Sequence, residues 1–196
     1  MKPSQIHEDL VSNEKLIDDS AQKKLLVELD RLQEKVTIRS RSWFTKKPLD
    51  GLYIYGSVGS GKTQLMDIFF QSLETSNKVR LHFHRFMQNL HNDMNRMTRQ
   101  EDPIKRIVEK LARKADVLCF DEFFVEDIGD AMMLARFLDR LFEAGIPLVA
   151  TSNIHPEFLY EGGLHRDRFY PAIESIKNHC KIYQLKTSQD YRLRNL

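Results

Sequence analysis

The sequence predicts an α/β fold in which helices cover both faces of a five-stranded parallel sheet. Short apolar runs alternate with amphipathic segments, and strands separated by helices of this length form right-handed βαβ units. The runs expected to be strands are 52–55, 79–83, 117–120, 147–151 and 181–185. Such a sheet binds its ligands at the carboxyl ends of its strands, so the residues that follow each run form the candidate site.

Length and composition limit the classes of protein that the chain can represent. Its 196 residues can bury one sizeable core, and 41% apolar with 30% charged residues is typical of a globular protein. A formal charge of +2 does not call for nucleic acid or a membrane as partner. Cys119 and Cys180 are too few for a disulfide framework, which favours a reducing compartment. Without an apolar leader or a membrane-length apolar run, we expect a cytoplasmic chain with no integral membrane segment.

The first part of the chain is expected to be peripheral to the sheet. Residues 1–17 are polar and irregular, which predicts a flexible tail. In the region 18–48 we expect one helix, with Asp19 and Gln22 spaced as in a capping box. The apolar residues on one face of that helix are Ala21, Leu25, Leu26, Leu29, Leu32 and Val36.

A basic, aromatic stretch from Arg39 to Lys47 follows this helix. It is interpreted first as a solvated linker held by one aromatic residue, and second as a contact for a partner or a lipid. Residues 49–196 then form the core domain. Amphipathic segments within the core predict helices at about 62–73, 86–97, 103–114 and 129–143.

The loop after the first strand matches the Walker A pattern in full. It consists of Gly56, Ser57, Val58, Gly59, Ser60, Gly61, Lys62 and Thr63. Its glycines let consecutive backbone N–H groups converge on a phosphate at the start of the next helix. Lys62 would reach the β and γ oxygens of ATP, and the Thr63 hydroxyl would ligate Mg²⁺. A chance glycine-rich turn would not also supply the preceding strand and the following helix.

Two acids, Asp121 and Glu122, follow the buried run at 117–120 in the Walker B form. Asp121 would hold Mg²⁺, and Glu122 would orient and deprotonate the water that attacks the γ-phosphate. A P-loop kinase needs no carboxylate for that step, so the pair predicts an ATPase. The alternative is two solvated acids at the end of a strand.

Polar residues also follow the run at 147–151. The amide of Asn153 could position the attacking water beside Glu122, although Thr151 or Ser152 could be mistaken for it. An ordinary turn is the alternative interpretation.

Several strings resemble the ZapE and Afg-one-like family of AAA+ ATPases. They are Gly-Leu-Tyr-Ile-Tyr-Gly (51–56), Leu-His-Phe-His-Arg-Phe-Met (81–87), Asp-Val-Leu-Cys-Phe-Asp-Glu-Phe-Phe-Val (116–125) and Asp-Tyr-Arg-Leu-Arg (190–194). The resemblance covers about residues 20–196. It implies a P-loop domain of AAA+ type that binds ATP or ADP with Mg²⁺, is recruited to the division septum and destabilises FtsZ polymers. The family continues into a helical lid, so with the chain stopping at Leu196 we expect the lid to be missing.

The same resemblance implies a role for Arg166 or Arg168. AAA+ proteins carry an arginine just before the fifth strand that completes the site of a neighbouring subunit in a homo-oligomer. Residues two apart in a helix point in different directions, so only one can serve, and Arg166 is favoured. Surface salt bridges are the alternative. Phe86 and Met87 are expected in the core, or else in a loop that grips polypeptide in an AAA+ pore.

A second function from a different class is a nucleotide-gated module like the bacterial helicase loaders, which would hold a helicase or single-stranded DNA. A DNA role should show a basic groove with interleaved aromatic residues, and only the stretch from Arg39 to Lys47 offers one. The sequence therefore favours the ATPase and does not favour nucleic acid as a partner.

Overall fold

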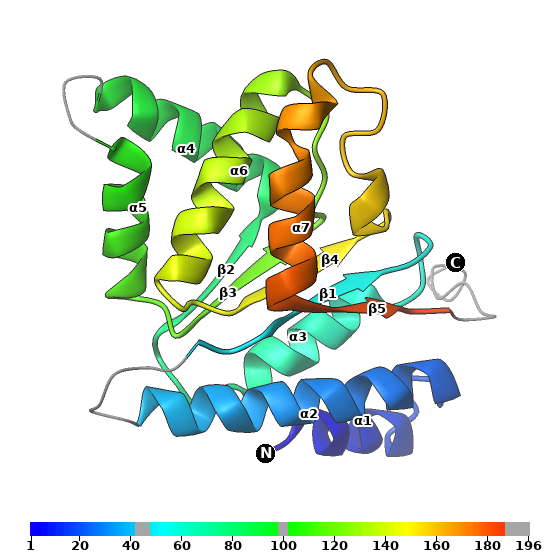
Figure 1. Cartoon of the computed structure of the whole chain (residues 1–196). Helices are drawn as coiled ribbons and strands as arrows, with labels where there is room; N and C mark the ends of the chain where they lie inside the picture. Colours follow the sequence, from blue (N-terminus) through cyan, green and yellow to red (C-terminus); the bar gives the residue numbers. More distant parts are fainter. Residues whose placement is uncertain (42–47, 98–101, 187–196) are drawn as a thin grey trace.

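The computed structural model describes residues 1–41, 48–97 and 102–186. In these residues five strands form one sheet in the order β2-β3-β4-β1-β5 (Figure 1). Every neighbouring pair is parallel, as predicted. The strands are β1 (Gly51–Tyr55), β2 (Lys78–His82), β3 (Val117–Asp121), β4 (Leu148–Ser152) and β5 (Cys180–Gln184).

Helices cover both faces of this sheet (Figure 1). On one face lie α1 (Pro3–Ser12), α2 (Ser20–Ser40) and α3 (Lys62–Ser72). On the other lie α4 (Phe83–Arg96), α5 (Pro103–Ala112), α6 (Ile128–Glu143) and α7 (Tyr170–His179). Two short 3₁₀ turns, η1 (Pro156–Phe158) and η2 (Arg166–Arg168), lie between β4 and α7. Among the described residues, no helix has both the length and the apolar character that crossing a bilayer requires.

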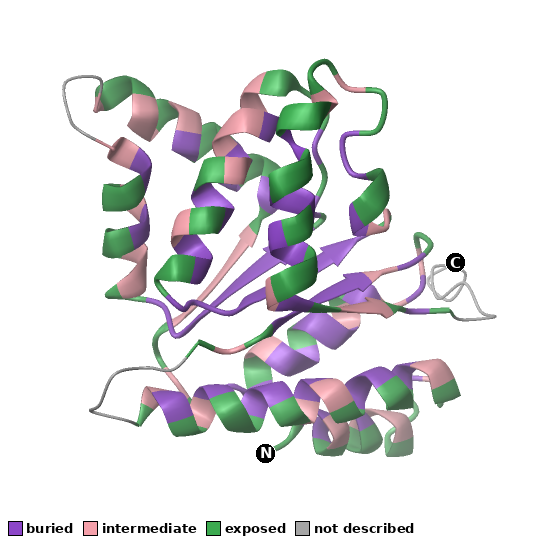
Figure 2. Ribbon diagram, in the orientation of Figure 1, coloured by how far each residue is buried: buried purple, intermediate pink, exposed green. Residues whose placement is uncertain are grey.

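The central strands are buried on both faces, because alternate side chains enter two separate cores. On β3, Val117 and Cys119 pack with residues of α2 and α3, whereas Leu118 and Phe120 pack with residues of α4–α7. Fully burying a side chain such as Phe120 contributes about 1.5–3 kcal/mol. Strands β2 and β5 lie at the edges and are only partly buried (Figure 2).

The predicted flexible tail is wrong, because most of residues 1–17 form helix α1, which packs on α2 and α3. Ile6 and His7 are buried. The Ser4 amide and hydroxyl donate to the Asp30 carboxylate at 2.9 and 2.6 Å. An isolated polar helix of ten residues has only marginal stability, so α1 is stabilised by its tertiary contacts. Local sequence patterns do not predict such contacts.

Two finer expectations about α2 also change. Asp19 caps α2 by accepting from the Ala21 amide at 2.7 Å, but Gln22 turns away into the protein and completes no capping box. Arg39 belongs to the last turn of α2, where it is buried and donates to the Gly145 carbonyl. Residues 42–47 of the basic stretch lie outside the described residues, as does the string 190–194.

Phe86 and Met87 lie in the core, as the simpler interpretation expected. The ring of Phe86 lies 4.7 Å from the rings of both Phe120 and Phe137, and Met87 is 1% exposed. Their place in α4 contradicts the pore-loop alternative, because a loop that grips a polypeptide must expose its side chains.

Candidate nucleotide site

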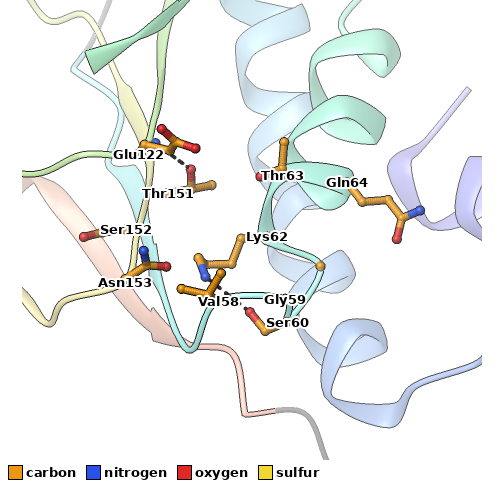
Figure 3. Close-up of a pocket in the computed structure, with 11 residues that line it drawn as sticks. Val58, Gly59, Ser60, Lys62, Thr63, Gln64, Glu122, Thr151, Ser152 and Asn153 are labelled. Carbon is orange, nitrogen blue, oxygen red and sulfur yellow. Dashed lines mark hydrogen bonds between the residues drawn. The ribbon is translucent and has the colours of Figure 1, made fainter. Parts of the chain in front are cut away.

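The candidate site lies where β1, β3 and β4 end. Because β4 pairs with both of the other strands, the residues after it lie between the phosphate loop and the two acids. A pocket of about 400 Å³ opens there (Figure 3). It is lined by Val58, Gly59, Ser60, Gly61, Lys62, Thr63, Gln64, Glu122, Thr151, Ser152 and Asn153.

Close contacts exclude a larger side chain at two positions of the phosphate loop. Gly61 has φ +88° immediately before α3, and a Cβ there would lie 2.5 Å from Gln22 Nε2. A Cβ on Gly56 would lie 2.5 Å from the carbonyl oxygen of Leu185, next to β5. The loop is thus held between α2 and the chain after β5, with the first turn of α3 directed at the pocket. This arrangement presents backbone N–H groups to an anion.

Lys62 is a cation with little access to water. It is 8% exposed, and its Nζ donates to the carbonyl oxygens of Gly56 (2.9 Å) and Ser57 (2.7 Å) and to Ser60 Oγ (3.4 Å; Figure 3). Within the part of the chain that the structure describes, no carboxylate pairs with it. Burial lowers the pKa of this ammonium group. A buried charge needs a counter-charge, so this geometry fits an anionic ligand such as a nucleotide phosphate.

Lys62→Ala should therefore weaken nucleotide binding itself. A charge-assisted contact contributes about 1.5–3 kcal/mol, which corresponds to roughly a tenfold to hundredfold rise in the Kd for ADP. Calorimetry measures this directly, with the exposed Lys110→Ala as the matched control. An unchanged Kd in a folded Lys62→Ala protein would contradict the assigned role.

The two acids have different surroundings. Asp121 is 3% exposed, lies outside the lining of the pocket and pairs with Arg80. Glu122 is exposed, lines the pocket and has φ +56°, an uncommon conformation for a residue with a side chain. Its amide lies 3.3 Å from Thr151 Oγ1, and the next amide, of Phe123, donates to the Thr151 carbonyl at 2.7 Å. The end of β4 thus holds the turn that places Glu122 in the pocket.

The polar residues at the end of β4 and directly after it have two different roles. Thr151 and Ser152 are buried, and their hydroxyls contact the backbone of Glu122 and Phe123. Asn153 is exposed and lines the pocket. Of the three candidates, Asn153 is the one whose side chain is not engaged in holding this turn, which supports its choice for orienting water.

Arg166 and Arg168 lie in η2 and do not line the pocket. The guanidinium of Arg166 donates to the Glu157 carbonyl at 2.5 Å and lies over the ring of Tyr170, 5.2 Å from its centroid. Arg168 is exposed, and no side-chain hydrogen bond or ion pair is found for it among the described residues. Arg166 is thus half-buried and Arg168 exposed, and neither lies in this chain's own nucleotide pocket.

Sequence reasoning missed two buried polar residues behind the phosphate loop. Gln22 and His7 are each 1% exposed. Gln22 Nε2 donates to the Ser60 carbonyl at 3.5 Å, and its Oε1 lies 3.2 Å from His7 Nε2. The available signal was that Gln22 lies on the apolar face of the predicted helix, but we interpreted this glutamine as part of a cap. In the structure Gln22 links the amino-terminal helices to the phosphate loop.

A Walker A loop after β1, an acidic pair at the end of β3 and a polar end on the intervening β4 define a P-loop domain of AAA+ type. The model for the family described as AFG1-like ATPase matches residues 1–196. The chain belongs to this family.

Individual relatives agree with that assignment. The cell division protein ZapE of Escherichia coli K12 is 53% identical over 149 residues, which cover 76% of this chain and 40% of ZapE. The chain thus matches less than half the length of this relative. AMPPCP-bound DnaA from Aquifex aeolicus superposes with TM-score 0.63 at 15% identity, covering 93% of this chain and 52% of DnaA. The DnaC helicase loader superposes with TM-score 0.60 at 13% identity, covering 86% of this chain and 92% of the loader. These structures confirm the predicted fold.

Proposed function

We propose that this domain binds ATP with Mg²⁺ and hydrolyses it to ADP and phosphate. The observation that carries the proposal is the buried Lys62 ammonium, unpaired with any described carboxylate, in a phosphate loop facing Glu122. A domain that only bound nucleotide would have no use for a strained, exposed carboxylate at the same pocket.

The residues take distinct roles in this proposal. The phosphate loop and Lys62 bind the β- and γ-phosphates. Thr63 is exposed at the pocket, and Asp121 lies at the end of β3 next to Glu122. Both carry oxygen donors of the kind that suits Mg²⁺, so the residues fit a metal site. Bound there, the metal would neutralise charge on the phosphates. Glu122 accepts a proton from the attacking water, which Asn153 orients.

Nucleotide binding should raise the stability of the folded chain. A ligand at a hundredfold excess over its Kd contributes about 2.7 kcal/mol, and roughly 1 kcal/mol shifts the Tm of a domain of this size by about 2–4 °C. Mg-ADP should therefore raise the melting temperature by several degrees. Free adenosine should leave it nearly unchanged, because the phosphate loop supplies most of the binding. Equal shifts from both would contradict this mode of binding.

We further propose that the ATPase acts in cell division at the septum, by ATP-dependent destabilisation of FtsZ polymers, as a nucleotide-dependent homo-oligomer. The 53% identity to ZapE supports the division role, and the FtsZ target comes from the family resemblance. The test is sedimentation of FtsZ polymers with this protein and ATP, with the Glu122→Gln variant as the matched control. Loss of pelleted FtsZ with the parent protein alone would support the target.

The helicase-loader alternative is supported by the fold shared with DnaC. Against it, Arg39 is buried and offers no cation to a nucleic acid backbone, and the charge of Arg41 is partly compensated by Glu74 at 2.8 Å. A salt-dependent shift of a labelled single-stranded oligonucleotide, with no effect on FtsZ, would favour the loader.

A further inference from the structure

The side chain of Arg80 joins the candidate metal ligand Asp121 to helix α3. Its Nε lies 2.6 Å from Asp121 Oδ2 and its Nη2 lies 3.1 Å from Oδ1, so one guanidinium contacts both carboxylate oxygens. Its Nη1 donates to Asp67 Oδ1 at 2.5 Å. None of the roles proposed for hydrolysis involves Arg80, so those roles do not account for its bidentate contact with Asp121.

The strand register makes this contact possible. Strands β2 and β3 pair so that Arg80 lies opposite Cys119, and His82 lies opposite Asp121. Because alternate residues of a strand share a face, Arg80 and Asp121 point to the face that α3 covers. The guanidinium then reaches two pairs further along the ladder, to Asp121 at the end of β3.

The geometry fixes the direction of the Asp121 carboxylate. The side chain of Asp121 is 5% exposed and that of Arg80 is 20% exposed, so little water competes for their contact. Burial alone lowers the pKa of Arg80, but its bonds to Asp121 and Asp67 more than offset this, and the pKa is raised overall. A carboxylate offers about four lone-pair sites, of which this contact takes two. No other hydrogen bond to the Asp121 carboxylate is found among the described residues, so the other two have no partner there.

We propose that Arg80 is a positioning residue for the magnesium site and holds Asp121 in the orientation that a hydrated Mg²⁺ requires. The proposal rests on the proposed function, because it takes the pocket to be a site for Mg-nucleotide. Outer partners of metal ligands typically contribute about 10–100-fold in metal affinity. Arg80 does not line the pocket, so its loss should weaken only the magnesium-dependent part of nucleotide binding.

The experiment measures the Kd of AMPPCP by calorimetry with Mg²⁺ and again with EDTA, and takes the ratio as the magnesium enhancement. Arg80→Lys keeps a positive charge beside Asp121 but cannot span both carboxylate oxygens, and Arg80→Gln removes the charge as well. In both variants the enhancement should fall about tenfold or more, with the Kd in EDTA unchanged. Near-ultraviolet circular dichroism checks folding, and Arg80→Lys decides the result if Arg80→Gln is unfolded.

Asp67→Asn is the matched control. Asp67 is 61% exposed and contacts Arg80 from the side away from Asp121. Exposed pairs contribute little, so this variant should keep the enhancement within about twofold. An unchanged enhancement in Arg80→Lys would overturn the proposal, and so would an equal loss of affinity with Mg²⁺ and with EDTA. If the parent protein bound no AMPPCP in either medium, the proposed function itself would fail, which is a different result.

Discussion

Replacing Glu122 by Gln should leave ATP binding nearly normal and lower turnover by about two or more orders of magnitude. The amide has the size of the carboxylate but cannot accept a proton from water. Glu122 is exposed in the pocket and makes no ion pair among the described residues, so its replacement removes no stabilising partner. The backbone strain at φ +56° is the same for both side chains. Turnover is measured as phosphate release, and binding by calorimetry.

The control for this experiment is Glu126→Gln. Glu126 is also exposed and lies four residues further along, but it does not line the nucleotide pocket. Its turnover should match that of the parent protein. If Glu122→Gln lost binding and turnover to the same degree, Glu122 would be a structural residue of the turn after β3, and water activation would have to be assigned elsewhere.

The parts of the site that are contiguous in sequence could be predicted. The phosphate loop, the two acids at the end of β3 and Asn153 each follow an apolar run, and parallel strands bring their carboxyl ends to one edge. Each strand was also placed within about one residue. For β2 the small shift arises because Phe83 begins α4 directly after the strand. The roles of the site residues stay predictions.

The contacts that the sequence did not reveal join residues far apart in the chain. Arg80 and Asp121 are separated by 41 positions, and Gln22 and Ser60 by 38. No local pattern specifies such pairs. Helix α7 was also absent from the predicted helices, and Pro171 lies in its first turn, where proline is well tolerated. The left-handed backbone of Glu122 depends on its contacts with β4 and has no signature in residue type.

Arg166→Ala should abolish most hydrolysis while leaving nucleotide binding intact. An arginine that completes a neighbouring subunit's site contributes about 10³–10⁵ in turnover. Arg166 is the stronger candidate because its guanidinium is held in place by the Glu157 carbonyl and Tyr170, and its Nε has no partner among the described residues. Arg168→Ala, two residues along the same turn, is the matched control and should keep most of the turnover.

Mixing variants distinguishes action between subunits from action within one. An Arg166→Ala subunit still has Glu122, and a Glu122→Gln subunit still has Arg166. Each variant alone should be nearly inactive, but in a mixture the interfaces that join one intact Glu122 to one intact Arg166 should recover part of the turnover. Turnover per subunit of the parent protein should also rise with concentration, because completed sites require assembly. No recovery on mixing, together with full activity in a monomer shown by light scattering, would contradict both the arginine acting in trans and the oligomer.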